Sequence, residues 1–438
     1  MIRGAVSGLG GGLVFGVVMA QVGFLPTVAA IVRTDSAALG FAVHMLFAAI
    51  IGAVFGLLVE RQRAEAPELL FWGLVYGAMW WFLGPLTLLP ILLGRPVTWD
   101  LSSGQSLAPS LFGHMAYGAV TAAVYAWRPQ SGAGRIGFAV VVKGAAAGLL
   151  AAAALIFGLG VMVGEIPYEL LLASPAVGAG YALLFGRQPD GPGPALIRGM
   201  VYGFAWWIVL VLTLPPLLAD GRLDWSIEAV RSALPGLPGH LLLGSGTGVI
   251  FVWLGGLRRL LFEDDVRRLR PGRFGVSASR AAGYGAVLGG AGGLVAAAFG
   301  GPLAIPTGLV IGVSYALLFR GRSFDPASGI GWGVSYGFLW WILGSLTLLP
   351  FLVSGHPRWQ AADLAAAFPS LIAHLVFGAV LGIGYQRLEE RSSPWWLTRG
   401  QVAAERAAAL REQTLGSAPA MWTLVLLLAV IIPTLVVG

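Results

Sequence analysis

The sequence predicts an all-α polytopic membrane protein with about 13 transmembrane helices. Hydrophobic residues make up 57% of the 438 positions and charged residues only 11%, whereas charged residues make up about 25% of an ordinary soluble protein. The mean hydropathy is +0.82. Apolar runs of about 20 residues, the length that crosses a hydrocarbon core, recur along the chain. These observations exclude a soluble globular fold.

Apolar windows between charged or Pro/Gly-rich breaks define the predicted spans. They cover residues 4–32, 37–59, 69–93, 109–127, 137–162, 167–186, 196–218, 236–257, 281–299, 302–319, 329–353, 369–386 and 420–437. The first window follows Arg3 and could imitate a signal peptide. Because its apolar run continues to Val32, we interpret it as a retained span.

The distribution of basic residues predicts the orientation of these spans. With a cytoplasmic N-terminus, the outer loops hold five of the 27 Lys and Arg residues, and the remaining 22 lie on the inner side. The five are Arg33, Arg95, Arg222, Arg231 and Arg358. Because short basic loops stay in the cytoplasm, the prediction is an N-in, C-out protein of the bacterial cytoplasmic (inner) membrane, in contact with membrane lipids.

Charge and cysteine content exclude several other classes of protein. The net charge of +7 follows from basic loops between apolar helices, so no nucleic-acid partner is predicted. The densest basic stretch, residues 258–280, is interpreted as a cytoplasmic loop held on anionic lipid, with docking of an acidic partner as the alternative. The absence of cysteine excludes disulfides, thiolate metal sites, iron–sulfur clusters and c-type haem attachment. No metal site is predicted.

One residue pattern occurs three times with identical spacing. The first copy holds Gly73, Tyr76, Gly77, Trp80, Trp81, Thr87, Pro90, Trp99, Pro109, His114 and Gly118. The second holds Gly199, Tyr202, Gly203, Trp206, Trp207, Thr213, Pro216, Trp225, Pro235, His240 and Gly244. The third holds Gly333, Tyr336, Gly337, Trp340, Trp341, Thr347, Pro350, Trp359, Pro369, His374 and Gly378. An alignment of this length without a gap predicts an internal triplication.

Each copy of the pattern is a helical hairpin, and a less regular hairpin precedes it, so the predicted repeat is a unit of four helices. An even number of helices gives all units one orientation, which makes them parallel repeats. The predicted boundaries are 1–130, 131–262 and 281–392 for the three units, 263–280 for a basic cytoplasmic linker, 393–419 for a cytoplasmic amphipathic linker, and 420–438 for a C-terminal transmembrane helix.

The repeated glycines and tryptophans have a structural and a binding interpretation. Glycines four residues apart, such as Gly73 and Gly77, let helices pack closely in lipid; close approach of backbone to a cofactor is the alternative. The mid-span Trp-Trp pairs are expected to fill the core and to hydrogen bond between helices, or to form a wall for a lipid tail, quinone or pigment. The outer Trp99, Trp225 and Trp359 are expected in the interfacial aromatic belt.

Four histidines are candidate cofactor-binding residues: His44, His114, His240 and His374. One interpretation is structural, with the imidazole bonding a carbonyl freed by the nearby proline, or a Trp N–H or Tyr hydroxyl of the paired helix. The second is ligation of a haem or pigment, for which the glycine one turn later would clear space. A titratable role is the third. No cofactor is therefore assigned, with haem or pigment as the alternative to none.

Together these side chains form a predicted structural node in each unit, which is not catalytic. Its residues are Tyr76, Trp80, Trp81, His114, Tyr202, Trp206, Trp207, His240, Tyr336, Trp340, Trp341 and His374.

Every Asp and Glu is expected in a loop or at a helix end and not in the membrane interior, the deepest being Glu165 and Glu169. Ion-coupled carriers place charged groups on their pathway, so the sequence argues against ion-coupled transport.

The hairpin motif, in the first copy Gly73 to Gly77, Leu86 to Pro90, Trp99 and Ser110 to Met115, resembles the two-helix motif of the YagU-like bacterial inner-membrane proteins. The resemblance covers about 60 residues per unit. It implies a membrane location and no assigned reaction, so it transfers no catalytic residue. Those relatives are single units, and the triplication departs from them.

Three functions remain open from the sequence. The first is a non-catalytic accessory or scaffold subunit, packing against other membrane protein subunits in a larger complex such as a respiratory or photosynthetic one. The second is a permease or a protein that handles lipids or other apolar solutes. The third is a b-type haem or pigment carrier that uses the outer-leaflet histidines. No enzymatic activity is predicted.

Overall fold

The computed structural model describes residues 1–60, 66–127, 136–160, 168–186, 191–262, 276–322, 326–392 and 400. Within these ranges all regular structure is helical, and nine helices are long and apolar enough to cross a membrane. They are Ile2–Gln21, Ala37–Glu60, Ala66–Leu92, Phe138–Gly158, Pro192–Asp220, Ile227–Gly256, Ala278–Ala298, Pro326–Ser354 and Ala361–Arg391. The chain is an all-α, multi-pass membrane protein, as the sequence predicts.

Three other predicted spans correspond to helices that are shorter or more polar. These are α7 (Ala108–Ala126), α10 (Tyr168–Phe185) and α16 (Ala304–Leu318). The predicted C-terminal span 420–437 and the amphipathic linker 393–419 lie outside the described residues, apart from the helical residue Gly400. Glu165 also lies outside them.

The boundary predicted for the first span is wrong. Helix α1 (Ile2–Gln21) ends eleven residues before Val32, because Gly23 adopts a positive φ of 69° that an L-residue disfavours. The chain then turns into α2 (Leu25–Ala29) and the short helix η1 (Ala30–Val32), and α2 packs on the next membrane helix. Apolarity continues through this turn, so hydropathy alone could not locate it.

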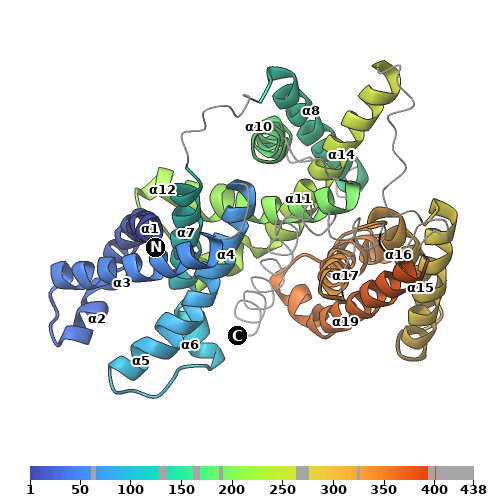
Figure 1. Ribbon diagram of the computed structural model, residues 1–438. Coiled ribbons are helices and arrows are strands. Elements are labelled where there is room, and N and C mark those ends of the chain that lie inside the picture. Colours follow the sequence, from blue (N-terminus) through green and yellow to red (C-terminus); the bar gives the residue numbers. More distant parts are fainter. Residues whose placement is uncertain are drawn as a thin grey trace.

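Twelve helices form three groups with the same plan (Figure 1). In each group the first helix packs on the second, the third on the fourth, and the first on the fourth. The first group is α1, α3 (Ala37–Glu60), α4 (Ala66–Leu83) and α7. The second is α8 (Phe138–Leu155), α10, α11 (Pro192–Trp207) and α14 (Leu237–Phe262), and the third is α15 (Ala278–Gly300), α16, α17 (Pro326–Trp340) and α19 (Ala361–Arg391).

Glycine contacts hold the third and fourth helices of each group together. A Cβ atom built on Gly118 would overlap the carbonyl oxygen of Gly73, and the pairs Gly244 with Gly199 and Gly378 with Gly333 are the same. The helix backbones therefore touch, which gives packing contacts where lipid supplies no hydrophobic driving force.

A π-helical segment interrupts the third helix of each group near its end. These segments are η2 (Gly84–Leu88), η4 (Ile208–Thr213) and η7 (Trp341–Leu348). In each, the repeated threonine hydroxyl donates to the carbonyl five residues earlier: Thr87 to Phe82 at 2.7 Å, Thr213 to Ile208 at 2.8 Å and Thr347 to Ile342 at 2.8 Å. No feature of the sequence indicated these π segments.

The proline after each π segment frees a carbonyl, because proline has no N–H to donate to the residue four positions earlier. For Pro90 and Pro350 these are the carbonyls of Leu86 and Leu346. The loop backbone bonds both: Thr98 N–H donates to Leu86 at 3.1 Å, and Arg358 N–H donates to Leu346 at 2.8 Å. The backbone of the connecting loop therefore provides a partner for both freed carbonyls.

Short helices connect the two long helices of each repeated hairpin. The chain passes through α5 (Leu89–Leu92) and α6 (Leu101–Ser106) in the first unit, and through α12 (Leu214–Asp220) and α13 (Ile227–Ala233) in the second. Asp100 caps α6 by accepting from Ser103 N–H at 2.8 Å, and the hydrogen bonds from Ser103 lower the pKa of the Asp100 carboxyl. In the third unit, α18 (Leu349–Ser354) leads to α19, which includes the connecting segment and continues through Pro369.

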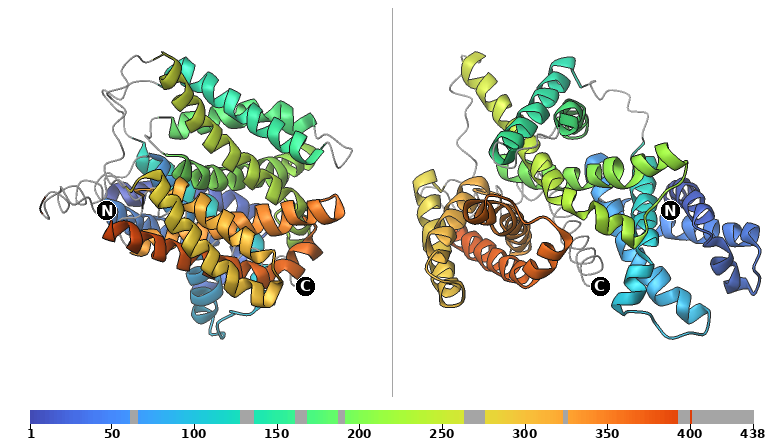
Figure 2. Two further views of the ribbon diagram at one scale, coloured as in Figure 1. Left: turned by 90° about the vertical axis from the view of Figure 1, so that its right-hand side faces the viewer. Right: turned by 180° about the vertical axis from the view of Figure 1, so that it is seen from behind.

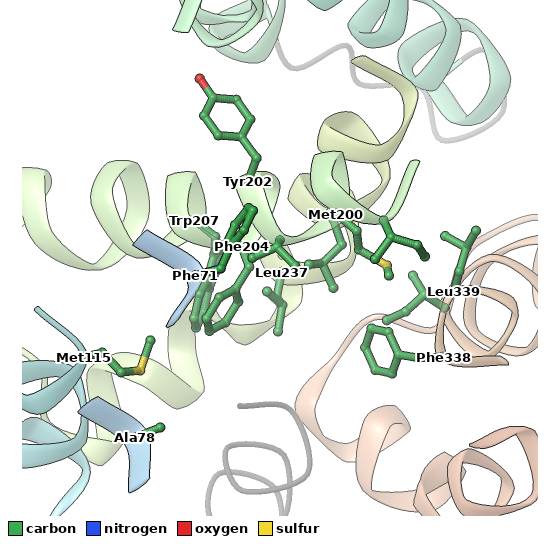
Figure 3. Close-up of a cluster of buried hydrophobic side chains, with 14 of the residues drawn as sticks. Phe71, Ala78, Met115, Met200, Tyr202, Phe204, Trp207, Leu237, Phe338 and Leu339 are labelled. Atoms are coloured by element: carbon green, nitrogen blue, oxygen red, sulfur yellow. The ribbon is translucent and has the colours of Figure 1, made fainter. Parts of the chain in front are cut away.

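The second unit lies between the other two, both in Figure 1 and in the right-hand view of Figure 2. Phe71 of the first unit stacks on Phe185 of the second, with ring centroids 5.8 Å apart. Figure 3 shows this core, where Phe71 lies beside Phe204 and Trp207, and Met200 points toward Leu339 of the third unit. Aromatic and aliphatic side chains therefore join the units.

Candidate functional site

The proline end of each repeated hairpin carries one set of side chains, which we call the hairpin-end cluster. In the first unit it consists of Trp81, Thr87, Trp99 and His114, and the aligned residues form it in the other units. The second tryptophan of each mid-span pair is fully buried, at 1%, 0% and 0% exposed. Its indole N–H donates to a backbone carbonyl at the end of the connecting segment: Trp81 to Leu107 at 3.0 Å, Trp207 to Ala233 at 3.0 Å and Trp341 to Ala367 at 3.2 Å.

The outer tryptophan closes the cluster from the loop side. Its N–H donates to the repeated threonine hydroxyl, from Trp99 to Thr87 at 3.1 Å, Trp225 to Thr213 at 3.2 Å and Trp359 to Thr347 at 3.0 Å. Each threonine therefore donates to its own helix and accepts from the loop. Trp225 is buried against Phe112 of the first unit, with ring centroids 5.8 Å apart, so the aromatic-belt interpretation is wrong for this residue.

The three repeated histidines bond their own helices. Nδ1 lies 2.8 Å from the Ser110 carbonyl in His114, 2.8 Å from the Gly236 carbonyl in His240 and 2.7 Å from the Ser370 carbonyl in His374. A helical side chain leans toward the helix N-terminus, which places the ring over the preceding turn. A bond to a Trp N–H or a Tyr hydroxyl of the paired helix was expected, but each Nδ1 atom bonds a carbonyl of its own helix.

His44 was grouped with these histidines but makes a different contact. Its Nε2 lies 2.9 Å from the Gly12 carbonyl on α1, so it links α3 to α1. The Phe15 ring packs in edge-to-face geometry with both His44 and His114, with ring centroids 5.4 Å and 4.6 Å apart. The structure thus brings His44 and His114 together around Phe15, a contact that their sequence positions did not indicate.

The repeated tyrosines tie the two hairpins of each unit together. Tyr76 O–H donates to the Ile51 carbonyl at 2.6 Å, Tyr202 to the Val177 carbonyl at 2.7 Å, and Tyr336 to Ser314 Oγ at 2.8 Å. The first tryptophan of each pair, Trp80, Trp206 or Trp340, packs edge-on against this tyrosine at 6.1–6.3 Å between centroids. The predicted node is thus divided into a tyrosine contact and a hairpin-end cluster.

A cavity of about 140 Å³ lies between the two hairpins of the first unit. His44, His114, Phe15, Trp80 and Tyr117 are part of its wall. An engineered cavity of about 150 Å³ in another protein holds a benzene molecule. This space accommodates one six-membered ring.

Two buried charged residues were missed by the sequence reasoning. Glu68 lies in the first turn of α4 and is 1% exposed, and Arg198 lies in α11 and is 5% exposed. Arg198 falls inside the predicted span 196–218, so its position was a readable signal. Both lie near the start of their helices, at the end opposite the hairpin-end clusters. Among the described residues no group of three His, Asp or Glu side chains is arranged to hold a metal ion.

No protein-family model, no curated protein and no solved structure matches the chain. The geometry of the clusters and the cavity is therefore the basis for any functional proposal.

Replacing one repeated histidine with alanine is expected to lower stability modestly. His114→Ala, His240→Ala and His374→Ala should each cost about 1 kcal/mol, the net contribution of a typical intramolecular hydrogen bond. Thermal unfolding in detergent measures this change. Loss of a stoichiometric Soret band on His114→Ala would instead show porphyrin ligation and contradict the structural role.

Thr213→Val is expected to remove two hydrogen bonds at once, from Thr213 to Ile208 and from Trp225 to Thr213. We expect a loss of about 1–3 kcal/mol, because both an indole N–H and a carbonyl lose a partner. Thr213→Ser is the matched control, since it keeps the hydroxyl, and it should retain most of the stability. Equal losses for both variants would show that the hydroxyl contributes little.

Proposed function

We propose that this protein is a non-catalytic accessory or scaffold subunit of a larger complex in the bacterial inner membrane. The observation that carries the proposal is the use of polar groups in the three hairpin-end clusters. Tryptophan, threonine and histidine groups bond backbone or one another at aligned positions in every unit. Such clusters brace a hairpin, and apolar helix faces remain for contact with other molecules.

The fourth helix of the third unit offers one such face. Ile372, Val376 and Val380 lie four residues apart on α19, and each is 54–63% exposed. Residues with this spacing share one side of a helix. The stripe suits a partner helix or lipid tails, and it is the surface that we assign to a partner subunit.

We also propose that the three units arose by triplication of one four-helix unit related to the YagU-like proteins. The same indole-to-carbonyl, indole-to-threonine and imidazole-to-carbonyl bonds at aligned positions support the triplication. The relation to YagU-like proteins rests on the sequence motif alone.

Photo-cross-linking in native membranes tests the scaffold proposal. A benzoylphenylalanine at Val376 should give a discrete protein adduct that identifies a partner subunit. The same label at Arg222, which lies in a connecting loop, is the control and should not give that adduct. Lipid adducts alone at Val376, together with a monodisperse single chain after mild extraction, would contradict the proposal.

The N-in, C-out orientation is part of the proposal and has its own test. The chain is free of cysteine, so single cysteines report sidedness without background. Arg222→Cys and Arg358→Cys should react with a membrane-impermeant maleimide from the periplasmic side. Reaction of either residue only from the cytoplasmic side would overturn the topology.

Handling of an apolar solute is the second candidate function, and the cavity beside His114 favours it. An apolar wall with few polar groups is typical of small-molecule sites. Solute-dependent flux in proteoliposomes that hold the purified chain would support this candidate over the scaffold.

A further inference from the structure

The cavity of the first unit has room for one aromatic ring. Its volume of about 140 Å³ is close to that of the benzene-binding cavity of about 150 Å³. The wall includes the aromatic side chains of Phe15, Trp80 and Tyr117. Aromatic side chains pack favourably against another ring in edge-to-face or offset-stacked contacts. The space therefore fits one aromatic ring.

Each of the two histidines on the wall has one ring nitrogen that can accept a hydrogen bond. A carbonyl only accepts, so the His114 nitrogen beside the Ser110 carbonyl is the protonated one, Nδ1. The neutral ring then has an acceptor lone pair at Nε2. For His44 the bond to the Gly12 carbonyl uses Nε2, which makes Nδ1 the acceptor. A ring that carries a hydroxyl supplies the donor that these acceptors need.

Glycine 84 keeps the His114 acceptor open to the cavity. A Cβ atom at Gly84 would lie 3.6 Å from His114 Nε2, and both residues line the cavity. The aligned histidines differ. In the second unit Leu210 occupies the position of Gly84. In the third unit this position is again a glycine, Gly344, but the next residue, Ser345, already has its Oγ 3.3 Å from His374 Nε2.

The cavity also reaches the exposed surface of the first unit. Phe47, Leu88 and Leu92 line it and are 37%, 43% and 53% exposed. They belong to α3, η2 and α5, which lie at one edge of the molecule (Figure 1). A hydrocarbon tail on the bound ring can leave the cavity along these side chains and enter the bilayer.

We propose that the first unit binds a lipophilic molecule with a hydroxylated aromatic ring, whose hydroxyl donates to His114 Nε2 and whose hydrocarbon tail extends into the bilayer. The inference rests on the second candidate function and is independent of the scaffold. It names the ligand class, a phenol-type lipid, and the residue that selects it.

A pair of probes tests the hydroxyl. Para-octylphenol and para-octylanisole have the same ring and tail, but the methyl ether has no donor. Binding to the full chain in nanodiscs is measured by isothermal titration calorimetry. We expect the phenol to bind about tenfold more tightly, the factor that one buried hydrogen bond typically supplies. Equal affinity of the two probes for the unaltered protein would overturn the proposal.

Two variants locate the site. His114→Phe should reduce the affinity for the phenol to that for the ether, and Gly84→Leu should weaken binding of both probes. His240→Phe is the matched control and should keep the tenfold preference, because His240 makes the same helix bond at 2.8 Å. A preference that survives in His114→Phe, or that His240→Phe removes equally, would overturn the assignment. If His114→Phe does not fold, the two probes on unaltered protein and on Gly84→Leu still decide.

The results of these experiments distinguish the phenol-type ligand from the two candidate functions, apolar-solute handling and the scaffold. Loss of the phenol preference with continued flux of other apolar solutes would reject the ligand class and retain the second candidate function. Cross-linking to a partner subunit at Val376 reports on the scaffold alone.

Discussion

Gly244→Leu is expected to lower the free energy of unfolding by about 3 kcal/mol or more, at the upper end of the cost of overpacking. A Cβ atom at Gly244 would overlap the Gly199 carbonyl oxygen and lie 2.7 Å from Gly203 N. Both neighbours are backbone atoms, so no side chain can swing aside. Helices α11 and α14 would have to separate. Thermal unfolding and the yield of folded protein measure the effect.

Gly283→Leu is the matched control for this prediction. Gly283 also lies in a membrane helix, α15, but apart from its chain neighbours and the adjacent backbone of that helix no atom would lie within 4 Å of an added Cβ. Because leucine favours helix by up to about 1 kcal/mol over glycine, stability should be unchanged or raised. Similar destabilisation by both substitutions would show that the Gly199–Gly244 contact is not what holds the hairpin.

Trp207→Ala is expected to cost about 2–3 kcal/mol, the second largest effect. Trp207 is fully buried and its N–H donates to the Ala233 carbonyl. Lipid is as apolar as the core, so the loss comes from the cavity left behind and the missing hydrogen bond rather than from hydrophobic transfer. Differential scanning fluorimetry in one detergent compares the variants.

The aligned substitutions should repeat this result. Trp81→Ala and Trp341→Ala remove the same bond from the other units and should have effects of similar size. Trp253→Ala is the control, because Trp253 is 62% exposed on α14, and it should be nearly neutral. A large loss for Trp253→Ala, or a neutral Trp207→Ala, would contradict the bracing role of the buried indole.

The sequence predicted the helical membrane class and the close glycine pairs because both depend on local composition and spacing. Hydropathy finds apolar helices, and small residues four positions apart indicate a packing face. Hydropathy misplaced the end of the first span, because the chain turns at Gly23 while its residues stay apolar as far as Val32. A change of direction within apolar sequence leaves hydropathy unchanged.

The sequence repeat identified the residues of the candidate site but only some of the contacts that these residues make. The repeat identified His114, Trp81 and Thr87, and the structure shows that Thr87 bonds its own helix. The partners of His114 and Trp81 depend on ring direction and on the path of the connecting segment, which spacing does not encode. The contact of His44 and His114 around Phe15 depends on the packing of α1 on α3 and α7, which no local pattern indicated.

Native mass spectrometry of the complex, isolated from its own membrane without detergent exchange, tests the central claim most directly. The scaffold account predicts that the 45.7 kDa chain is found in one assembly with other protein subunits at fixed stoichiometry. A lone, monodisperse chain that catalyses solute flux on reconstitution would contradict it.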